Sequence, residues 1–216
     1  MLFNSIHFII FFPLVITLYF LIKPNYRWIL LLLASYYFYM SWKPEYVILL
    51  IISTIFNYYI AIKIDKSSKN RKALLVACLI FNFGILFAFK YFNFVNESLR
   101  DFLRVFSIPF SPLALNILLP IGISFYTFQL ASYIIDVYRK QIPPEKHLGI
   151  FALYVSFFPK LIAGPIERAK NLIPQLYEKH NFHYNELIGG AKLMLWGFFK
   201  KLVIADRLAL VVDTVY

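Results

Sequence analysis

The stretch that decides the fold is Leu118-Leu-Pro-Ile-Gly-Ile-Ser-Phe-Tyr-Thr-Phe-Gln-Leu-Ala-Ser-Tyr-Ile-Ile-Asp-Val-Tyr-Arg139. Roughly 20 residues at about 1.5 Å each match the ~30 Å hydrocarbon thickness of a bilayer, so this stretch predicts a membrane-spanning helix. Its Gln129, Ser132 and Asp136 have the spacing i, i+3, i+7 and therefore share one helical face. Ionisable groups at membrane depth normally face protein or a water-filled cavity, so this face is expected to look toward the rest of the chain.

The composition places the chain in the membrane class. Of its 216 residues, 61% are hydrophobic and 20% are aromatic, and the mean hydropathy is +0.68, which is rare in a soluble globular domain. The net charge of +11 is spread over turns between apolar segments. The positive-inside rule therefore explains the charge better than binding to nucleic acid does. The single cysteine, Cys78, allows no disulfide within the chain and is expected to be a buried thiol.

Apolar runs recur along the chain, and we expect spans at 6–22, 28–42, 46–62, 73–94 and 118–139, with Pro120 in the first turn of the last one. The segment 96–116 predicts a short interfacial helix that ends before its prolines. The first run lacks a basic region before it and a cleavage site, so it is interpreted as a retained span.

Alternation of these spans sorts the basic residues unequally between the two sides of the membrane. One side would hold Lys23, Arg27, Lys63, Lys66, Lys69, Arg71, Lys72, Arg139, Lys140 and Lys146, and the other side would hold Lys43, Arg100 and Arg104. The richer side is predicted to be cytoplasmic, which places the N-terminus outside. We therefore expect an all-α, multi-pass helical bundle in the cytoplasmic (inner) membrane, with the lipid bilayer as its surroundings.

The regular pattern stops after Pro143-Pro144. The apolar run 148–158 is too short to span, and the next residues, Pro159-Lys-Leu-Ile-Ala-Gly-Pro-Ile-Glu-Arg168, combine proline, glycine and charge. Such backbone is tolerated at membrane depth only where protein or a water cavity satisfies it, so a re-entrant segment is the preferred interpretation. The alternative is an interfacial loop whose Lys160 and Arg168 contact headgroups. A later apolar run, 186–205, is expected to end at Asp206-Arg207, crossing the bilayer or lying at its interface.

Residue chemistry alone leaves two functions open. The sequence has no phosphate-binding glycine loop, no Gly-x-Ser-x-Gly elbow and no His-Glu-x-x-His. His180 and His183 have the spacing i, i+3, but no nearby cysteine or carboxylate pair completes a metal site, so no metal is expected. A polar helix face beside broken backbone is typical of an acyl-transfer enzyme, but also of a transporter with discontinuous helices.

Three longer stretches carry a resemblance to a known family. They are Leu119-Pro-Ile-Gly-Ile-Ser-Phe-Tyr-Thr-Phe-Gln129 continuing to Arg139, then Phe157-Phe-Pro-Lys-Leu-Ile-Ala-Gly-Pro-Ile-Glu-Arg168, and Gly197-Phe-Phe-Lys-Lys-Leu-Val-Ile-Ala-Asp-Arg207. Together with Met1-Leu-Phe-Asn-Ser5 and Ala34-Ser-Tyr-Tyr-Phe-Tyr-Met-Ser-Trp42, they resemble the membrane-bound O-acyltransferase family, in the bacterial branch that O-acetylates exported polysaccharides such as alginate. The likeness runs in order through essentially the whole chain and favours this family over a transporter.

The resemblance implies an activity and partners. Members of the family transfer an acyl group, supplied on the cytoplasmic side by a donor or carrier, to a hydroxyl of an acceptor. In this branch the acceptor is an exported polysaccharide or cell-envelope polymer, and a separate extracytoplasmic acetyltransferase often takes part. Acetyl is the expected group, and D-alanyl transfer by a related branch stays open. No bound cofactor is implied.

The resemblance also implies where the catalytic residue lies. The family's acceptor-activating histidine belongs to its later half, beyond residue 216, and none of His7, His147, His180 or His183 lies in a matching context. Residues 1–216 are therefore expected to form the N-terminal part of one membrane domain, either a fragment or a split gene product. A polymer-export component, or a non-catalytic half that needs a partner, is the alternative. The acyltransferase hypothesis places five residues where they line or shape the substrate tunnel, namely Gln129, Asp136, Lys160, Glu167 and Arg168. The alternative, which stays open and is favoured over direct contact with substrate, is that they pack helices and anchor them at the interface.

Overall fold

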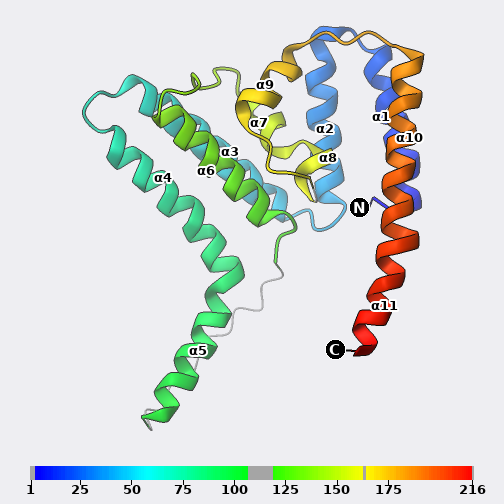
Figure 1. The fold of residues 1–216 in the computed structure, drawn as a ribbon. Helices are drawn as coiled ribbons and strands as arrows, with labels where there is room; N and C mark the ends of the chain where they lie inside the picture. The colour runs from blue at the N-terminus through cyan, green and yellow to red at the C-terminus, as the bar shows by residue number, and fades with distance from the viewer. Residues whose placement is uncertain (1–2, 107–118, 163, 216) are drawn as a thin grey trace. The chain divides into compact units, whose positions relative to one another are not determined.

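The computed structural model describes residues 3–106, 119–162 and 164–215. Within these ranges every regular element is a helix (Figure 1), which agrees with the expected all-α class. The helices form two compact units, one made of Met1–Pro24 with Lys179–Tyr216 and the other of Asn25–Glu178.

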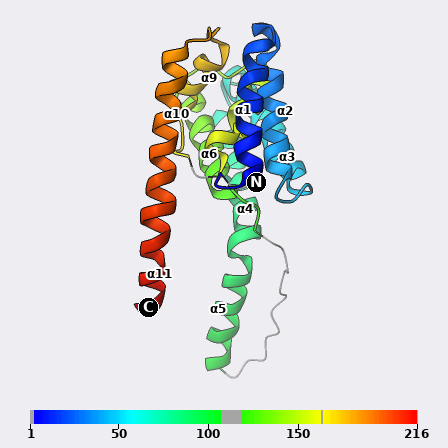
Figure 2. The ribbon, with the colours of Figure 1, turned by 90° about the vertical axis from the view of Figure 1, so that its right-hand side faces the viewer.

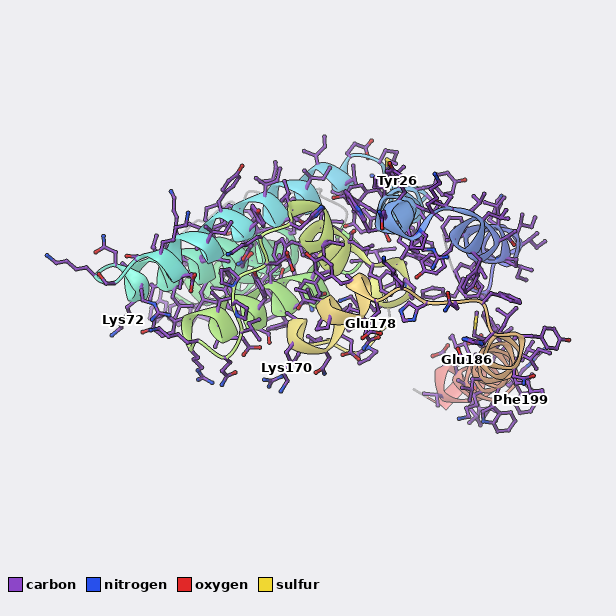
Figure 3. The ribbon with its side chains drawn as sticks, turned by 90° about the horizontal axis from the view of Figure 1, so that it is seen from above. Tyr26, Lys72, Lys170, Glu178, Glu186 and Phe199 are labelled. Atoms are coloured by element: carbon purple, nitrogen blue, oxygen red, sulfur yellow. The ribbon has the colours of Figure 1, made fainter. Side chains whose placement is uncertain are left out.

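The first unit contains α1 (Ile6–Leu21) and the helical run α10 (Tyr184–Phe199), the π-helical segment Lys200–Ala205 and α11 (Asp206–Val215). The hydroxyl of Ser5 caps α1 by accepting a hydrogen bond from the backbone N–H of Phe8. The apolar run expected at 186–205 lies in this helical run, whose backbone continues past Asp206-Arg207 into α11. Asp206 is paired with Lys201 on the exposed surface. Side chains surround α10, where Glu186 and Phe199 are labelled (Figure 3).

The second unit holds the remaining helices. Their bounds are α2 (Arg27–Met40), α3 (Tyr46–Lys66), α4 (Arg71–Leu86), α5 (Phe92–Val105), α6 (Ile123–Tyr138), α7 (Leu148–Ser156), α8 (Phe158–Leu161) and α9 (Ala169–Tyr177). In it, α6 packs against both α3 and α4, and α7 packs against α2 and α3 (Figure 1). The buried residues of α6 and α7 form the centre of this unit's core.

A buried polar pair joins α3 to α4. The side-chain amides of Asn57 and Asn82 bond each other reciprocally, with Nδ2 to Oδ1 distances of 2.9 and 2.8 Å. The thiol of Cys78 donates to Asn57 Oδ1 at 3.2 Å, and all three side chains are buried. The buried thiol agrees with the sequence-based expectation. Because amides buried among apolar side chains need partners, the pair fixes the register of the two helices.

The helix that begins at Arg71 is longer than expected. A π-helical turn at Phe87–Tyr91 joins α4 to α5 without a break, so the separate interfacial helix expected in 96–116 is instead the continuation of α4 up to Val105 (Figure 2). A π turn widens a helix without ending it, which preserves the backbone hydrogen bonding. The prolines of that segment lie outside the described residues.

Two helices in the described ranges are long and apolar enough to cross a membrane, namely Tyr46–Lys66 and Arg71–Val105. The helix Ile6–Leu21 is apolar but shorter.

Helix α6 begins later than the sequence predicts. It starts at Ile123, so Pro120 precedes the helix instead of lying in its first turn. The reason is Gly122, whose φ of +76° is left-handed and whose added Cβ would lie 2.5 Å from the carbonyl oxygen of Leu161. With 16 residues the helix is about 24 Å long, less than a hydrocarbon core. Most of its residues are buried, which makes it a central helix of the unit.

One end of the second unit gathers its basic segments. Arg71, at the start of α4, donates to the carbonyl of Tyr138 at the end of α6 at 2.6 Å. The hydroxyl of Tyr58 on α3 donates to the carbonyl of Lys146 at 2.5 Å, and the rings of Trp28 and His147 meet edge to face. The start of α2, the start of α4 and the loop after α6 therefore share one end of the unit, as the alternation of spans requires.

Candidate functional site

The site is built on a hairpin, residues 147–177, that leaves this basic end and returns to it. The hairpin starts at His147, whose Nδ1 accepts a hydrogen bond from the backbone N–H of Ile150 at 3.1 Å and so caps α7. Its helix α7 is almost entirely buried, and it ends at Phe157, whose ψ of 109° is not helical. We refer below to this segment, described except for residue 163, as the returning hairpin.

The turn of the hairpin rests on α2. Pro159 lies in the first turn of the short helix α8, where its missing N–H costs no hydrogen bond. The backbone N–H of Phe158 donates to the hydroxyl of Ser35 on α2 at 3.2 Å, and the ring of Phe158 packs against Phe38. The first N–H groups of a helix have no acceptor within the helix, and here a side chain from another helix supplies one.

The second limb of the hairpin comes back to the loop before α7. The hydroxyl of Tyr177, at the end of α9, donates to Glu145 Oε1 at 2.8 Å, and the same oxygen accepts from the backbone N–H of His147 at 2.7 Å. Burial first, and then this bond to the carboxylate, raises the pKa of Tyr177 to about 12, so the phenol remains a donor at neutral pH. Both limbs therefore end at one carboxylate.

The polar residues predicted to shape the site converge on Tyr154 of α7. Gln129 Nε2 on α6 donates to the carbonyl of Tyr154 at 2.8 Å. The hydroxyl of Tyr154 donates to the carbonyl of Glu167 at 3.3 Å, and Lys160 Nζ lies 4.4 Å from the centre of its ring. We call this group, completed by Asp136 and Arg168, the Tyr154 cluster.

A longer contact closes the cluster between α6 and the returning limb. Arg168 Nη1 lies 3.9 Å from Asp136 Oδ1. The Asp136 side chain is nearly buried, whereas that of Arg168 is 57% exposed, so the carboxylate is fixed and the guanidinium reaches it from the surface. Gln129 and Asp136 both lie on the inward face of α6, as expected from their spacing, while Phe125 and Phe128 are exposed on its other side.

Lys160 differs from the other charged members of the cluster because its charge is buried with neither a hydrogen bond nor an ion pair among the described residues. Its residue is only 9% exposed, and Nζ has no hydrogen-bonding partner among the described residues. The face of the Tyr154 ring is its nearest aromatic neighbour, which offers a cation a weak attraction but accepts no ordinary hydrogen bond.

Sequence reasoning missed the residue at the centre of the site. Tyr154 lies in the short apolar run 148–158, and no pattern in that run predicts that its hydroxyl contacts Glu167. Ser35 was likewise hidden among the aromatic residues of its helix. A tyrosine or serine in an otherwise apolar buried segment is the signal that was available, because such hydroxyls need partners.

The cluster provides charged and hydrogen-bonding groups on a buried scaffold. Its members are an amide, two carboxylates, an ammonium, a guanidinium and a phenol, and it contains no histidine. Such a set suits the binding and orientation of a polar group better than the removal of a proton from a hydroxyl near neutral pH.

Comparison with known proteins shows what the chain is similar to. It is 41% identical over 215 residues to the probable alginate O-acetylase AlgI of Pseudomonas aeruginosa, an alignment that covers 97% of this chain and 41% of that protein. It is 40% identical to the protein of the same name from Azotobacter vinelandii, over 97% of this chain and 42% of that protein. The peptidoglycan O-acetyltransferase of Helicobacter pylori is 34% identical, over 97% of this chain and 45% of that protein.

The chain thus spans about two fifths of the length of the curated relatives it matches. No protein-family model matches it, and no solved structure matches it. The similarity to these O-acetylating proteins nevertheless extends over nearly every residue of the chain, and it includes the segments that build the Tyr154 cluster. Over nearly its whole length the chain is thus similar to members of the membrane-bound O-acyltransferase family, the family that its motifs resemble.

Proposed function

We propose that this chain takes part in transferring an acyl group, acetyl in the first instance, to hydroxyls of an exported polysaccharide or another cell-envelope polymer. The observation that carries the proposal is the similarity over 97% of the chain to proteins named for O-acetylation of two different polymers, alginate and peptidoglycan. Both names describe O-acetylation, which on these polymers means acylation of a sugar hydroxyl. The two names differ in the polymer that is modified.

The proposed setting is a multi-pass arrangement in the cytoplasmic membrane. The two long apolar helices support it, and so does the gathering of basic segments at one end of the second unit. That end is proposed to face the cytoplasm, which places the N-terminus outside. The returning hairpin is proposed to enter the membrane from the cytoplasmic end and to leave on the same side. Its polar backbone is bonded by Ser35 of α2, Gln129 of α6 and its own Tyr154.

The proposed role of the Tyr154 cluster is to line the path of the acyl group. The donor or carrier is proposed to approach from the cytoplasmic end, where both limbs of the hairpin begin, and an extracytoplasmic acetyltransferase is a proposed partner on the other side. Because the cluster contains no histidine, we assign its residues to binding and orientation. In an enclosed site such groups raise the rate by holding the reactants in place and excluding water.

The test measures the transfer of isotopically labelled acetyl to the envelope polymer by cells that carry the full-length protein. Asp136→Ala removes the buried carboxylate opposite Arg168, and we expect transfer to fall by about tenfold or more while the protein still inserts into the membrane. The control is Asp101→Ala, whose carboxylate is 62% exposed and pairs with its neighbour Arg100. Transfer at the wild-type level in Asp136→Ala would remove Asp136 from the proposed path.

The same experiment distinguishes the competing functions. Labelled D-alanine on the polymer in place of acetyl would identify the acyl group as D-alanyl. If neither label reaches the polymer, and a solute flux depends on the protein, the transporter alternative is favoured and the proposed transfer function is wrong.

A further inference from the structure

The ammonium of Lys160 is the one charged group of the Tyr154 cluster that is nearly buried and has neither a hydrogen bond nor an ion pair among the described residues. It lies in the turn of the returning hairpin, where Phe158 and Leu161 beside it are buried. No carboxylate in the described part of the chain lies within 4.0 Å of its Nζ. The Nζ of Lys160 therefore has hydrogen-bonding capacity that the described residues do not use.

Packing alone does not account for this lysine. Leaving a buried charge without a partner is destabilising, and an apolar side chain of similar size usually fits such a site at no cost or with a gain in stability. A side chain that is unfavourable for folding, and that lies in the turn of a functional hairpin, indicates a ligand that supplies the missing acceptor.

The charges of the cluster indicate the kind of acceptor. Lys160 and Arg168 contribute two positive charges, and Glu167 and Asp136 contribute two negative ones. The cluster is therefore formally neutral, so it has no excess positive charge with which to compensate the desolvation of an anion. A neutral oxygen suits the site better, because it can accept a hydrogen bond from Nζ without adding a charge that must be desolvated.

We propose that Lys160 binds the carbonyl oxygen of the acyl group, carried as a thioester by the donor or as an ester by the product, by donating a hydrogen bond from Nζ. This proposal rests on the proposed acyl transfer and adds the residue that holds the acyl group. Lys160 acts here as a binding residue, and no bond to its nitrogen is formed. The ring of Tyr154 covers one side of the ammonium and leaves its remaining hydrogens for the carbonyl.

The test measures ligand binding to the purified full-length protein, separately from catalysis. The probes are S-acetylpantetheine and S-ethylpantetheine, which differ only in the acyl carbonyl, and methyl 6-O-acetylglucoside and methyl 6-O-ethylglucoside, which make the same comparison for an ester. The variants are Lys160→Met, which keeps an unbranched side chain of nearly the same length without a donor, and Lys160→Gln, which keeps a donor without the charge. Binding is read from the rise of the unfolding midpoint with probe concentration.

We expect the wild-type protein to bind an acetyl probe more tightly than its ethyl counterpart, with the thioester or the ester pair showing which carrier the site accepts. Lys160→Met should remove this preference, weakening the acetyl probe by about tenfold, while its unfolding midpoint without ligand stays equal or rises. Lys160→Gln should keep most of the preference. This opposite movement of stability and binding would not arise if the lysine had a purely structural role.

Three results would overturn the proposal. They are a wild-type protein with no preference for either acetyl probe, an undiminished preference in Lys160→Met, and a lowered unfolding midpoint in Lys160→Met, which would show that the ammonium is satisfied inside the protein itself. Failure of the proposed function is a different result. In that case cells carrying the wild-type protein would transfer no labelled acetyl to the polymer, regardless of how the purified protein binds the probes.

Discussion

At the scale of single residues, the clearest structural device is the amide pair between α3 and α4. Asn57 and Asn82 satisfy each other at 2.8 and 2.9 Å in a buried position, and Asn82 also donates to the carbonyl of Cys78 at 3.0 Å. In a membrane, where apolar packing gives little preference for one helix pairing over another, such a pair specifies which faces meet.

The first prediction is that Asn57→Ala and Asn82→Ala are coupled. Each change leaves the other amide without one partner, so each should lower the free energy of unfolding by about 1–3 kcal/mol, and the double variant should lose less than the sum by roughly 0.6–1.7 kcal/mol. The measurement is a double-mutant cycle of unfolding in detergent. Asn57→Ala combined with Ser35→Ala, on a helix that does not share this pair, is the control and should be additive. Additivity in the asparagine cycle would contradict the prediction.

The second prediction concerns Gly122, which sets where α6 begins. Gly122→Ala requires a left-handed φ with a side chain and places Cβ 2.5 Å from the Leu161 carbonyl oxygen, so stability should fall by about 1–3 kcal/mol. The matched control is Gly84→Ala, near the end of α4 but inside the continuous helix Arg71–Val105, where an added Cβ meets nothing within 4 Å. There, the gain in helix propensity should raise stability by up to about 1 kcal/mol. Equal effects of the two changes on the unfolding midpoint would contradict this account.

At the scale of elements, the returning hairpin is the unit from which the site is made. Its first limb is fixed by burial of α7, its turn by the bond of Phe158 to Ser35, and its second limb by the bond of Tyr177 to Glu145. The two ends of the hairpin therefore meet at one carboxylate, while its middle carries Tyr154 and Lys160.

The third prediction is that Tyr177→Phe loosens the second limb selectively. Loss of a hydrogen bond to a carboxylate is worth about 1.5–3 kcal/mol when the bond is protected from solvent, and this one is partly exposed, so the expected loss is about 1 kcal/mol or less. Amide hydrogen exchange in α9 should become up to about fivefold faster, with α3 unchanged. Tyr184→Phe, whose side chain lies outside the second unit and is 65% exposed, is the control. Faster exchange in α3 and α9 alike would indicate general destabilisation instead.

At the scale of the whole molecule, the two ends of the second unit differ in charge, and the hairpin begins and ends at the basic one. Each end of the second unit carries exposed lysines. Lys69 lies in the turn between α3 and α4, Lys146 precedes α7, and Lys170 lies in α9, whereas Lys43 lies between α2 and α3.

The fourth prediction is the sidedness of these lysines when each is changed to cysteine in the full-length protein. A membrane-impermeant maleimide should label Lys43→Cys in intact cells, and label Lys69→Cys, Lys146→Cys and Lys170→Cys only after the membrane is opened. The natural Cys78 is buried and should stay unlabelled in both conditions. Labelling of Lys170→Cys from outside would show that residues 147–177 cross the membrane, which would contradict the proposed return to the cytoplasmic side.

The sequence by itself determined the helical class, the family resemblance and the inward face of α6, and it singled out every member of the Tyr154 cluster except Tyr154 itself. These follow from composition, from helical spacing and from long motifs, all of which are local or additive properties of the chain. The sequence did not determine the start of α6 at Ile123, the continuation of α4 into α5, or the position of Tyr154 at the centre of the site. Those were decided by contacts between segments far apart in the chain: the Leu161 carbonyl that excludes a side chain at residue 122, and the Glu167 carbonyl that accepts the Tyr154 hydroxyl. Only the tertiary structure brings such groups within reach, because their partners are chosen by packing and not by spacing along the chain.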